Sequence, residues 1–183
     1  MPKQRIDKIP GILTALEVKT LLQTAQVERP EIVPYIVLCV FCGVRPTKAQ
    51  RIDWKDISLD RQEVFVLSKS SKTGNERYVT LQPNAIEWLL PYRQRSGAIF
   101  HTRKAFDRVR KKSDVQWYHD TMMHTYGSMH VAAFRNAGDT AEQMGHGSST
   151  SMLFRHYRRA VRQEDALKFR EIKPSDAVAG IVE

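Results

Sequence analysis

The stretch YIVLCVFCGVRP, residues 35–46, decides the fold class. Residues 35–42 form the longest apolar run of the chain, which is too short to cross a membrane and indicates a buried helix. Gly43 is of the type that commonly ends a helix, and Pro46 suits the first turn of the next one. Arg45 therefore lies at a helix end, either as an ordinary surface arginine or held so that its guanidinium faces a phosphate.

Helices are expected on both sides of this stretch. Residues 14–17, TALE, have the pattern of a capping box and predict the start of a helix with Leu16, Val18, Leu21 and Leu22 on its apolar face. Pro30 or Pro34 opens the helix that contains the apolar run. Further helices are expected after Pro83, at residues 101–112, at 119–134, from a capped start at Asp139 to Gly145, and from Ser149 through Val161.

The periodicity changes near residue 62. Residues 64–67 and 78–81 are short β-type runs, and the polar, turn-rich stretch between them predicts a hairpin with a basic loop that contains Lys72. Residues 54–57 are expected to add a third strand. The chain is therefore expected to be mainly α with a small three-stranded antiparallel sheet.

Length and composition bound the class of protein. The chain has 183 residues, of which 42% are hydrophobic and 27% charged, as is typical of a folded domain with its own core. We expect an N-terminal arm or linker at residues 1–12, one domain at 13–174 and a tail at 175–183. The N-terminus leads into no signal-type stretch and only two cysteines are present, so we expect a cytoplasmic protein without membrane association.

The net charge of +9 points to a polyanionic partner. Nucleic acid is the leading candidate, and a protein that is merely basic is the alternative. Residues 101–112 combine apolar positions at helical spacing with one very basic face, and more arginines surround Tyr157, although both groups could also be solvated surface. The residues expected to contact phosphates are Arg103, Lys104, Arg108, Lys111, Lys112, Arg155 and Arg158.

Three further residues are informative only in combination. Lys72 could reach a ligand from the hairpin loop, His146 could donate to an oxyanion, and Tyr157 lies among arginines. Taken singly, each has an ordinary interpretation, as a loop lysine, a histidine bonded to a carbonyl and a core tyrosine. The CVFC stretch at residues 39–42 has no second cysteine pair, so neither a zinc site nor a redox site is expected there.

Together these features resemble the catalytic domain of the tyrosine recombinase (phage integrase) family. The resemblance runs from about Ile12 to Pro174. It is carried by CGVR at 42–45, DWKDI at 53–57, KTGNERYVTL at 72–81, MGH at 144–146 and RHY at 155–157. It implies the recombinase catalytic-domain fold and catalytic roles for Arg45, Lys72, His146 and Tyr157.

In that family the tyrosine attacks a DNA phosphate, becomes joined to the 3′ side and frees a 5′ hydroxyl, with no metal or nucleotide cofactor. A tyrosine of pKa about 10 is a weak nucleophile at neutral pH, so the reaction depends on cations and donors around the phosphate. Lys72 would protonate the leaving oxygen. The resemblance implies double-stranded DNA as the partner and no cofactor, and it leaves self-association on DNA open.

The chain departs from the family pattern in the middle box. His124 and Thr125 align with it, which places Met123 where the second catalytic arginine is expected, and a methionine cannot hold a phosphate. The chain could be a degenerate recombinase, Met123 could be an engineered change, or another arginine, such as Arg135 or Arg155, could fill the gap.

A second departure lies at the N-terminus. Only about a dozen residues precede the matched region, where family members carry a helical domain that clamps the other side of the DNA. We therefore expect an excised catalytic domain or a protein without that clamp. The expected function is that of a site-specific recombinase or integrase, impaired at Met123, and the alternative is a non-catalytic DNA-binding relative.

Overall fold

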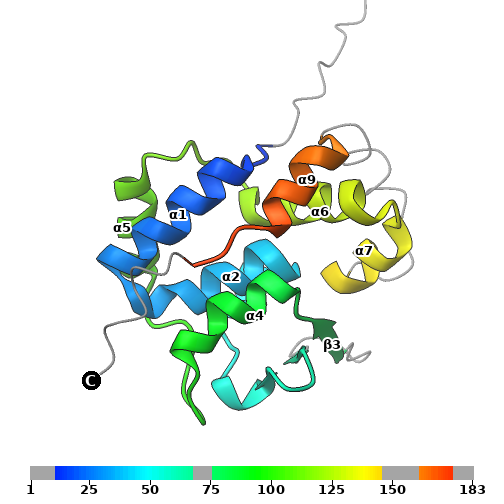
Figure 1. The fold of residues 1–183 in the computed structure, drawn as a ribbon. Coiled ribbons are helices and arrows are strands. Elements are labelled where there is room, and N and C mark those ends of the chain that lie inside the picture. The colour runs from blue at the N-terminus through cyan, green and yellow to red at the C-terminus, as the bar shows by residue number, and fades with distance from the viewer. Residues whose placement is uncertain (1–10, 68–75, 146–160, 175–183) are drawn as a thin grey trace, which may run out of the picture.

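Helix α2 (Val33–Cys42) is the element around which the others pack, and all ten of its residues are buried, as the apolar stretch predicted. It contacts α1 (Ala15–Glu28), α4 (Pro83–Leu89) and α6 (Thr121–Phe134), which surround it in Figure 1. The computed structural model describes residues 11–67, 76–145 and 161–174. Those residues are mainly helical, with one small antiparallel sheet, so the expected fold class is confirmed.

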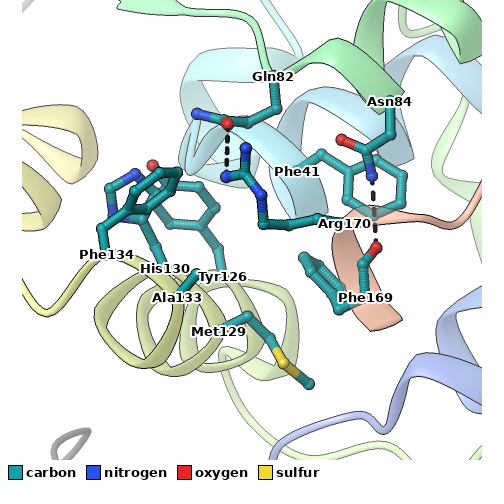
Figure 2. A pocket seen from close by; sticks show the side chains of 10 residues that line it. All are labelled: Phe41, Gln82, Asn84, Tyr126, Met129, His130, Ala133, Phe134, Phe169 and Arg170. Atoms are coloured by element: carbon teal, nitrogen blue, oxygen red, sulfur yellow. Dashed lines mark hydrogen bonds between the residues drawn. The ribbon is translucent and has the colours of Figure 1, made fainter. Parts of the chain in front are cut away.

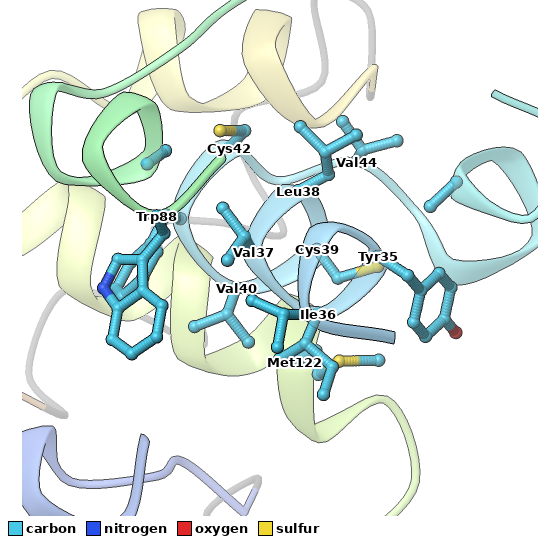
Figure 3. Close-up of a cluster of buried hydrophobic side chains, with 14 of the residues drawn as sticks. Tyr35, Ile36, Val37, Leu38, Cys39, Val40, Cys42, Val44, Trp88 and Met122 are labelled. Atoms are coloured by element: carbon cyan, nitrogen blue, oxygen red, sulfur yellow. The ribbon is translucent and has the colours of Figure 1, made fainter. Parts of the chain in front are cut away.

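The core contains large side chains from several helices. Figure 3 shows Trp88 of α4 and Met122 of α6 beside side chains of α2 such as Val40. Tyr35 is also buried, and its ring packs edge-on against Phe106. Burial of such side chains contributes about 1.5–3 kcal/mol each, which is why the apolar run fixes the centre of the domain.

The remaining helices, turns and strands are short. Three are single 3₁₀ turns, namely η1 (Pro30–Ile32), η2 (Trp54–Asp56) and η3 (Leu90–Tyr92). The others are α3 (Pro46–Ala49), β1 (Ile57–Ser58), β2 (Glu63–Val66), β3 (Arg77–Thr80), α5 (Arg103–Ser113), α7 (Ala137–Met144) and α9 (Gln163–Arg170).

The capping box at the start of α1 is confirmed. The backbone N–H of Glu17 donates to Oγ1 of Thr14 at 3.2 Å, and the backbone N–H of Thr14 donates to Oε2 of Glu17 at 2.7 Å. Leu22 is buried, but Leu16 is 72% exposed, so its expected place on the apolar face was wrong. Val18 and Leu21, the other two apolar residues expected in this helix, are buried as predicted.

The sheet has the order β1-β2-β3, with antiparallel neighbours. The hairpin forms as expected, with Val64 opposite Val79. The third strand is shorter than expected, because the Asp53 side chain accepts from the N–H of Lys55 at 3.0 Å and starts a 3₁₀ turn in place of most of the strand. Of the expected strand at residues 54–57, only Ile57 pairs with β2, and the pairing extends to Ser58.

The C-terminal half differs from expectation in two places. Helix α7 begins at Ala137 rather than near Asp139, because Oδ1 of Asn136 accepts from the N–H of Asp139 at 3.1 Å and caps the helix earlier. Gly145 ends it in the left-handed conformation, as expected. Helix α9 was not expected, and the helix expected from Ser149 through Val161 falls almost wholly on residues 146–160, outside the described residues.

The segment from α9 to Lys173 closes the core: α9 packs on α6 and α1, and the segment bonds to α4. The indole Nε1 of Trp88 donates to the carbonyl of Ile172 at 3.0 Å, and Asn84 donates to the carbonyl of Phe169 at 3.4 Å. Lys173 pairs with Glu87 at 3.0 Å. None of the helices formed by the described residues is long and apolar enough to span a membrane.

Candidate functional site

Arg45 is fixed by the backbone on both sides. Gly43 ends α2 in the left-handed conformation, and the N–H of Val44 donates to the carbonyl of Leu38 at 3.1 Å. The carbonyl of Arg45 accepts from the N–H of Ala49 at 2.9 Å, which starts α3. The Arg45 residue itself is exposed. The predicted helix end at Gly43 and the helix start at Pro46 are therefore confirmed, and the role of Arg45 stays a prediction.

Tyr126 of α6 lies directly behind this turn. A Cβ atom at Gly43 would come within 2.4 Å of the Tyr126 ring, so the close approach requires glycine. The Tyr126 hydroxyl is buried and has no hydrogen-bond partner in the described part of the chain. Burial is the main cause that raises the pKa of Tyr126 well above its usual range. The phenol therefore stays protonated and acts as part of the wall.

A second guanidinium, that of Arg77 at the start of β3, lies within electrostatic reach of Arg45. Nη2 of Arg77 donates to the carbonyl of Gln143 at 3.4 Å, and a Cβ atom at Gly145 would come within 2.5 Å of Nη1. Burial lowers the pKa of Arg77, and the positive charge of Arg45 lowers it further. Sequence reasoning missed Arg77, because an arginine in a β-strand carries no signal of its own.

Met123 does not offer a donor to this site. It is 7% exposed and packs with Tyr126, Met144 and other apolar residues between α6 and α7. Met123 lies one turn before Tyr126 on the same helix. An arginine at position 123 would therefore be attached next to Tyr126, the residue that packs behind Arg45. The structure thus shows Met123 in an apolar contact, and the sequence resemblance predicts a cation at this position.

The other sequence-predicted site residues lie outside the described residues. These are Lys72, His146 and Tyr157, together with the DNA contacts expected at Arg155 and Arg158. Their flanks are described: Arg77 follows the hairpin loop and Gly145 precedes His146, and these two residues touch. The structure therefore brings together the ends of the two segments that carry Lys72 and His146.

Helix α5 presents the expected basic face. Oγ1 of Thr102 accepts from the N–H of Ala105 at 3.2 Å, and Phe106 and Val109 are buried. The helix packs on α1. Arg103 pairs with Asp107 at 3.1 Å and Arg108 pairs with Glu28 at 2.8 Å. The exposed side chains without an ion pair among the described residues are Lys104, Lys111 and Lys112.

A separate small hollow lies between α4, α6 and α9 (Figure 2). Arg170 crosses it, with its guanidinium 4.3 Å from the centre of the Phe134 ring and Nη1 donating to Gln82 at 2.9 Å. Phe41 and Phe169 meet edge-on at 5.0 Å on its wall. Gln82 accepts from Arg170 and Asn84 donates to the carbonyl of Phe169, so these polar groups of the hollow hold α9 in place.

The two cysteines are buried thiols. Cys39 and Cys42 form no disulfide, and burial raises the pKa of Cys42 to about 12. Among the described residues, no group of three or more histidine, cysteine or acidic side chains is placed to hold a metal ion.

Comparison with known proteins gives a family and a fold. The sequence model of the Phage integrase family matches residues 12–164. No curated protein matches the chain. Among solved structures, the chain is similar to the XerA recombinase, with a TM-score of 0.69 and 17% identity over 92% of this chain and 65% of that one.

Two further structures show the same likeness. The catalytic domain of bacteriophage HP1 integrase has a TM-score of 0.66 and 18% identity, over 87% of this chain and 95% of that domain. The integrase from mycobacterium phage Brujita has a TM-score of 0.65 and 20% identity, over 98% of this chain and 66% of that one. The chain thus spans about two thirds of two of these proteins and nearly all of an isolated catalytic domain.

Proposed function

Because this chain belongs to the phage integrase family, we propose that it binds double-stranded DNA and cleaves and rejoins a strand through a tyrosine-linked intermediate. The observation that carries the proposal is the placement of Arg45, exposed on a backbone that α2 and α3 hold rigid. A guanidinium at such a position can donate two parallel hydrogen bonds to a phosphate. The similar XerH recombinase was solved bound to its difH substrate, after and before cleavage.

The proposed reaction exchanges one phosphate ester for another. The phenolic oxygen of Tyr157 attacks phosphorus and gives up its proton, the bond from phosphorus to the 5′ oxygen breaks, and Lys72 protonates that oxygen as it leaves. Arg45 and His146 stabilise the charge on the non-bridging oxygens. Attack by a 5′ hydroxyl on the tyrosine ester reverses these steps and rejoins the strand.

Helix α5 provides the proposed contact with the DNA backbone. Its exposed lysines Lys104, Lys111 and Lys112 are not engaged in ion pairs among the described residues. Arg103 and Arg108 would have to exchange their carboxylate partners for phosphates. With a net charge of +9, most of the binding free energy is expected to come from counterion release.

The test is a covalent adduct on a nicked duplex. The duplex carries the presumed site, and a nick close to the cleaved bond lets the short fragment diffuse away, so that cleavage cannot reverse. We expect a denaturation-resistant protein–DNA adduct, formed slowly and without added metal. Tyr157→Phe should abolish it with nearly unchanged DNA affinity, and Arg45→Ala should also abolish it.

Tyr118→Phe is the matched control, because Tyr118 is 47% exposed and lies outside the proposed site. It should form the adduct at the unaltered rate. An adduct that persists in Tyr157→Phe would move the nucleophile to another residue.

The second candidate is a non-catalytic DNA-binding relative. The buried Met123, in place of a cation, is the observation that favours it. Losing one such donor typically costs on the order of 10²–10³ in rate. Salt-sensitive DNA binding without any adduct after long incubation would establish this candidate and reject the enzyme.

A further inference from the structure

We propose that Arg77 holds a DNA phosphate together with Arg45, and so supplies the second guanidinium that the family pattern places at Met123. The inference rests on the proposed function, because it takes the ligand to be a phosphate of DNA. It concerns a residue of the sheet, whereas Met123 belongs to a helix.

Arg77 is held between the hairpin and α7. Its guanidinium lies against the backbone of Gly145, where any side chain would collide with Nη1 and Cζ. The backbone N–H of Thr80 donates to Oε1 of Gln143 at 3.0 Å, which ties β3 to the end of the same helix. In Figure 1, β3 lies next to α7. Arg77 is thus fixed at the point where the chain enters the segment with His146.

The contacts of Arg77 leave most of its hydrogen-bonding capacity unused in the described part of the chain. Its Nε is buried without a partner, and the bond from Nη2 to Gln143 is long at 3.4 Å. None of the ion pairs among the described residues includes Arg77, and its charged neighbour is another arginine, Arg45.

A half-buried cation beside a like charge raises the free energy of the folded protein, unless an anion binds there. Burial and the charge of Arg45 both lower the pKa of Arg77, because both disfavour its charged form. A phosphate that met both guanidiniums would remove the repulsion and satisfy the unused donors. The pair is therefore arranged for a ligand rather than for stability.

Arg135 cannot fill the gap at Met123. It ends α6 at the opposite end from Met123, roughly 18 Å away along the helix axis. Its Nη2 donates to Gln163 at 3.1 Å. Arg170 is similarly engaged with Gln82 and Phe134. Arg155 lies outside the described residues, so Arg77, whose charge interacts with that of Arg45, is the candidate for the second guanidinium.

The first test measures affinity for a short duplex at several salt concentrations. It compares the unaltered protein with Arg77→Gln and with Arg61→Gln, which removes the same charge from the exposed turn between β1 and β2. Arg77→Gln should reduce the slope of log affinity against log salt by about one, and Arg61→Gln should leave it unchanged. An unaltered slope in Arg77→Gln, or an equal loss in both variants, overturns the inference.

The second test separates ligand binding from a structural role. Without DNA, Arg77→Gln should melt at the same temperature as the unaltered protein or higher, because it removes a charge that is held at a cost. A melting temperature lower by more than about 5 °C would make Arg77 a stabilising contact and overturn the inference.

The third test uses the nicked duplex. Arg77→Gln should slow adduct formation about a hundredfold, and Met123→Arg should restore part of it in the Arg77→Gln background. An unaltered adduct rate in Arg77→Gln, or no recovery in a folded double variant, overturns the shared role. If the unaltered protein forms no adduct, the proposed cleavage fails, and the salt dependence still decides whether Arg77 holds a phosphate.

Discussion

His130 is a buried titratable residue whose hydrogen bonds define its tautomer. Its Nδ1 lies 2.7 Å from Oγ1 of Thr140, and Thr140 donates its own proton to the carbonyl of Asn136 at 2.8 Å. The ring therefore donates from Nδ1. Burial is the main cause that lowers the pKa of His130 to about 4. The carboxylate of Asp139 raises this pKa in part, and the positive charge of Arg170 lowers it further.

This residue makes stability depend on pH. Histidine in the unfolded chain has a pKa near 6.5. The contribution of His130 to the free energy of unfolding is therefore full above that pH and is lost as the pH falls toward 4. We expect it to lower the free energy of unfolding by roughly 2 kcal/mol between pH 7 and pH 5, as measured by urea unfolding. His130→Gln should lose most of this drop, whereas the exposed His101→Gln should keep it. An equal drop in His130→Gln would contradict the assignment.

At the residue scale, the sequence correctly predicted the backbone around Arg45, because that backbone follows from local residue types. Gly43 and Pro46 bracket Arg45, and the structure has the backbone that they imply. Arg77 could not be found in this way, because its role depends on a contact with Gly145, 68 positions later in the chain. Met123 was identified only through the family resemblance, and its burial became visible only in the packing of α6.

The proposed contribution of α5 to DNA binding can be tested by removing positive charge from that helix. Replacing both Lys111 and Lys112 by alanine should reduce the salt slope of DNA binding by about two and weaken binding to all sequences alike. The control replaces Lys19 and Lys168, which are exposed on α1 and α9, and should leave the slope closer to that of the unaltered protein. Equal losses would show that only net charge matters.

Element boundaries were predicted well where one residue type decides them. The capping box at Thr14, the glycine ends of α2 and α7 and the proline start of α3 all hold. The start of α7 was wrong because Asn136 competes with Asp139 as the cap. Helix α9 was missed because its eight residues bury only two side chains, Ala166 and Phe169, which is too weak a periodic signal.

The domain as a whole depends on the segment that follows residue 160. A chain that ends at Val161 would lose the bond from Trp88 to Ile172 and the packing of Phe169 on Phe41, on the order of 5 kcal/mol together. This is comparable with the total stability of many domains, so we expect a large fall in melting temperature or an insoluble product. A chain that ends at Pro174 keeps all these contacts and should melt like the full chain.

The burial of α2 also supplies an intrinsic reporter of unfolding. Cys39 and Cys42 are the only thiols of the chain, both are fully buried, and burial raises the pKa of each. Thiolate is the reactive form, so an alkylating reagent can label this protein only when the centre of the core opens. The labelling rate then measures core opening in any variant discussed above, without an added dye or tag.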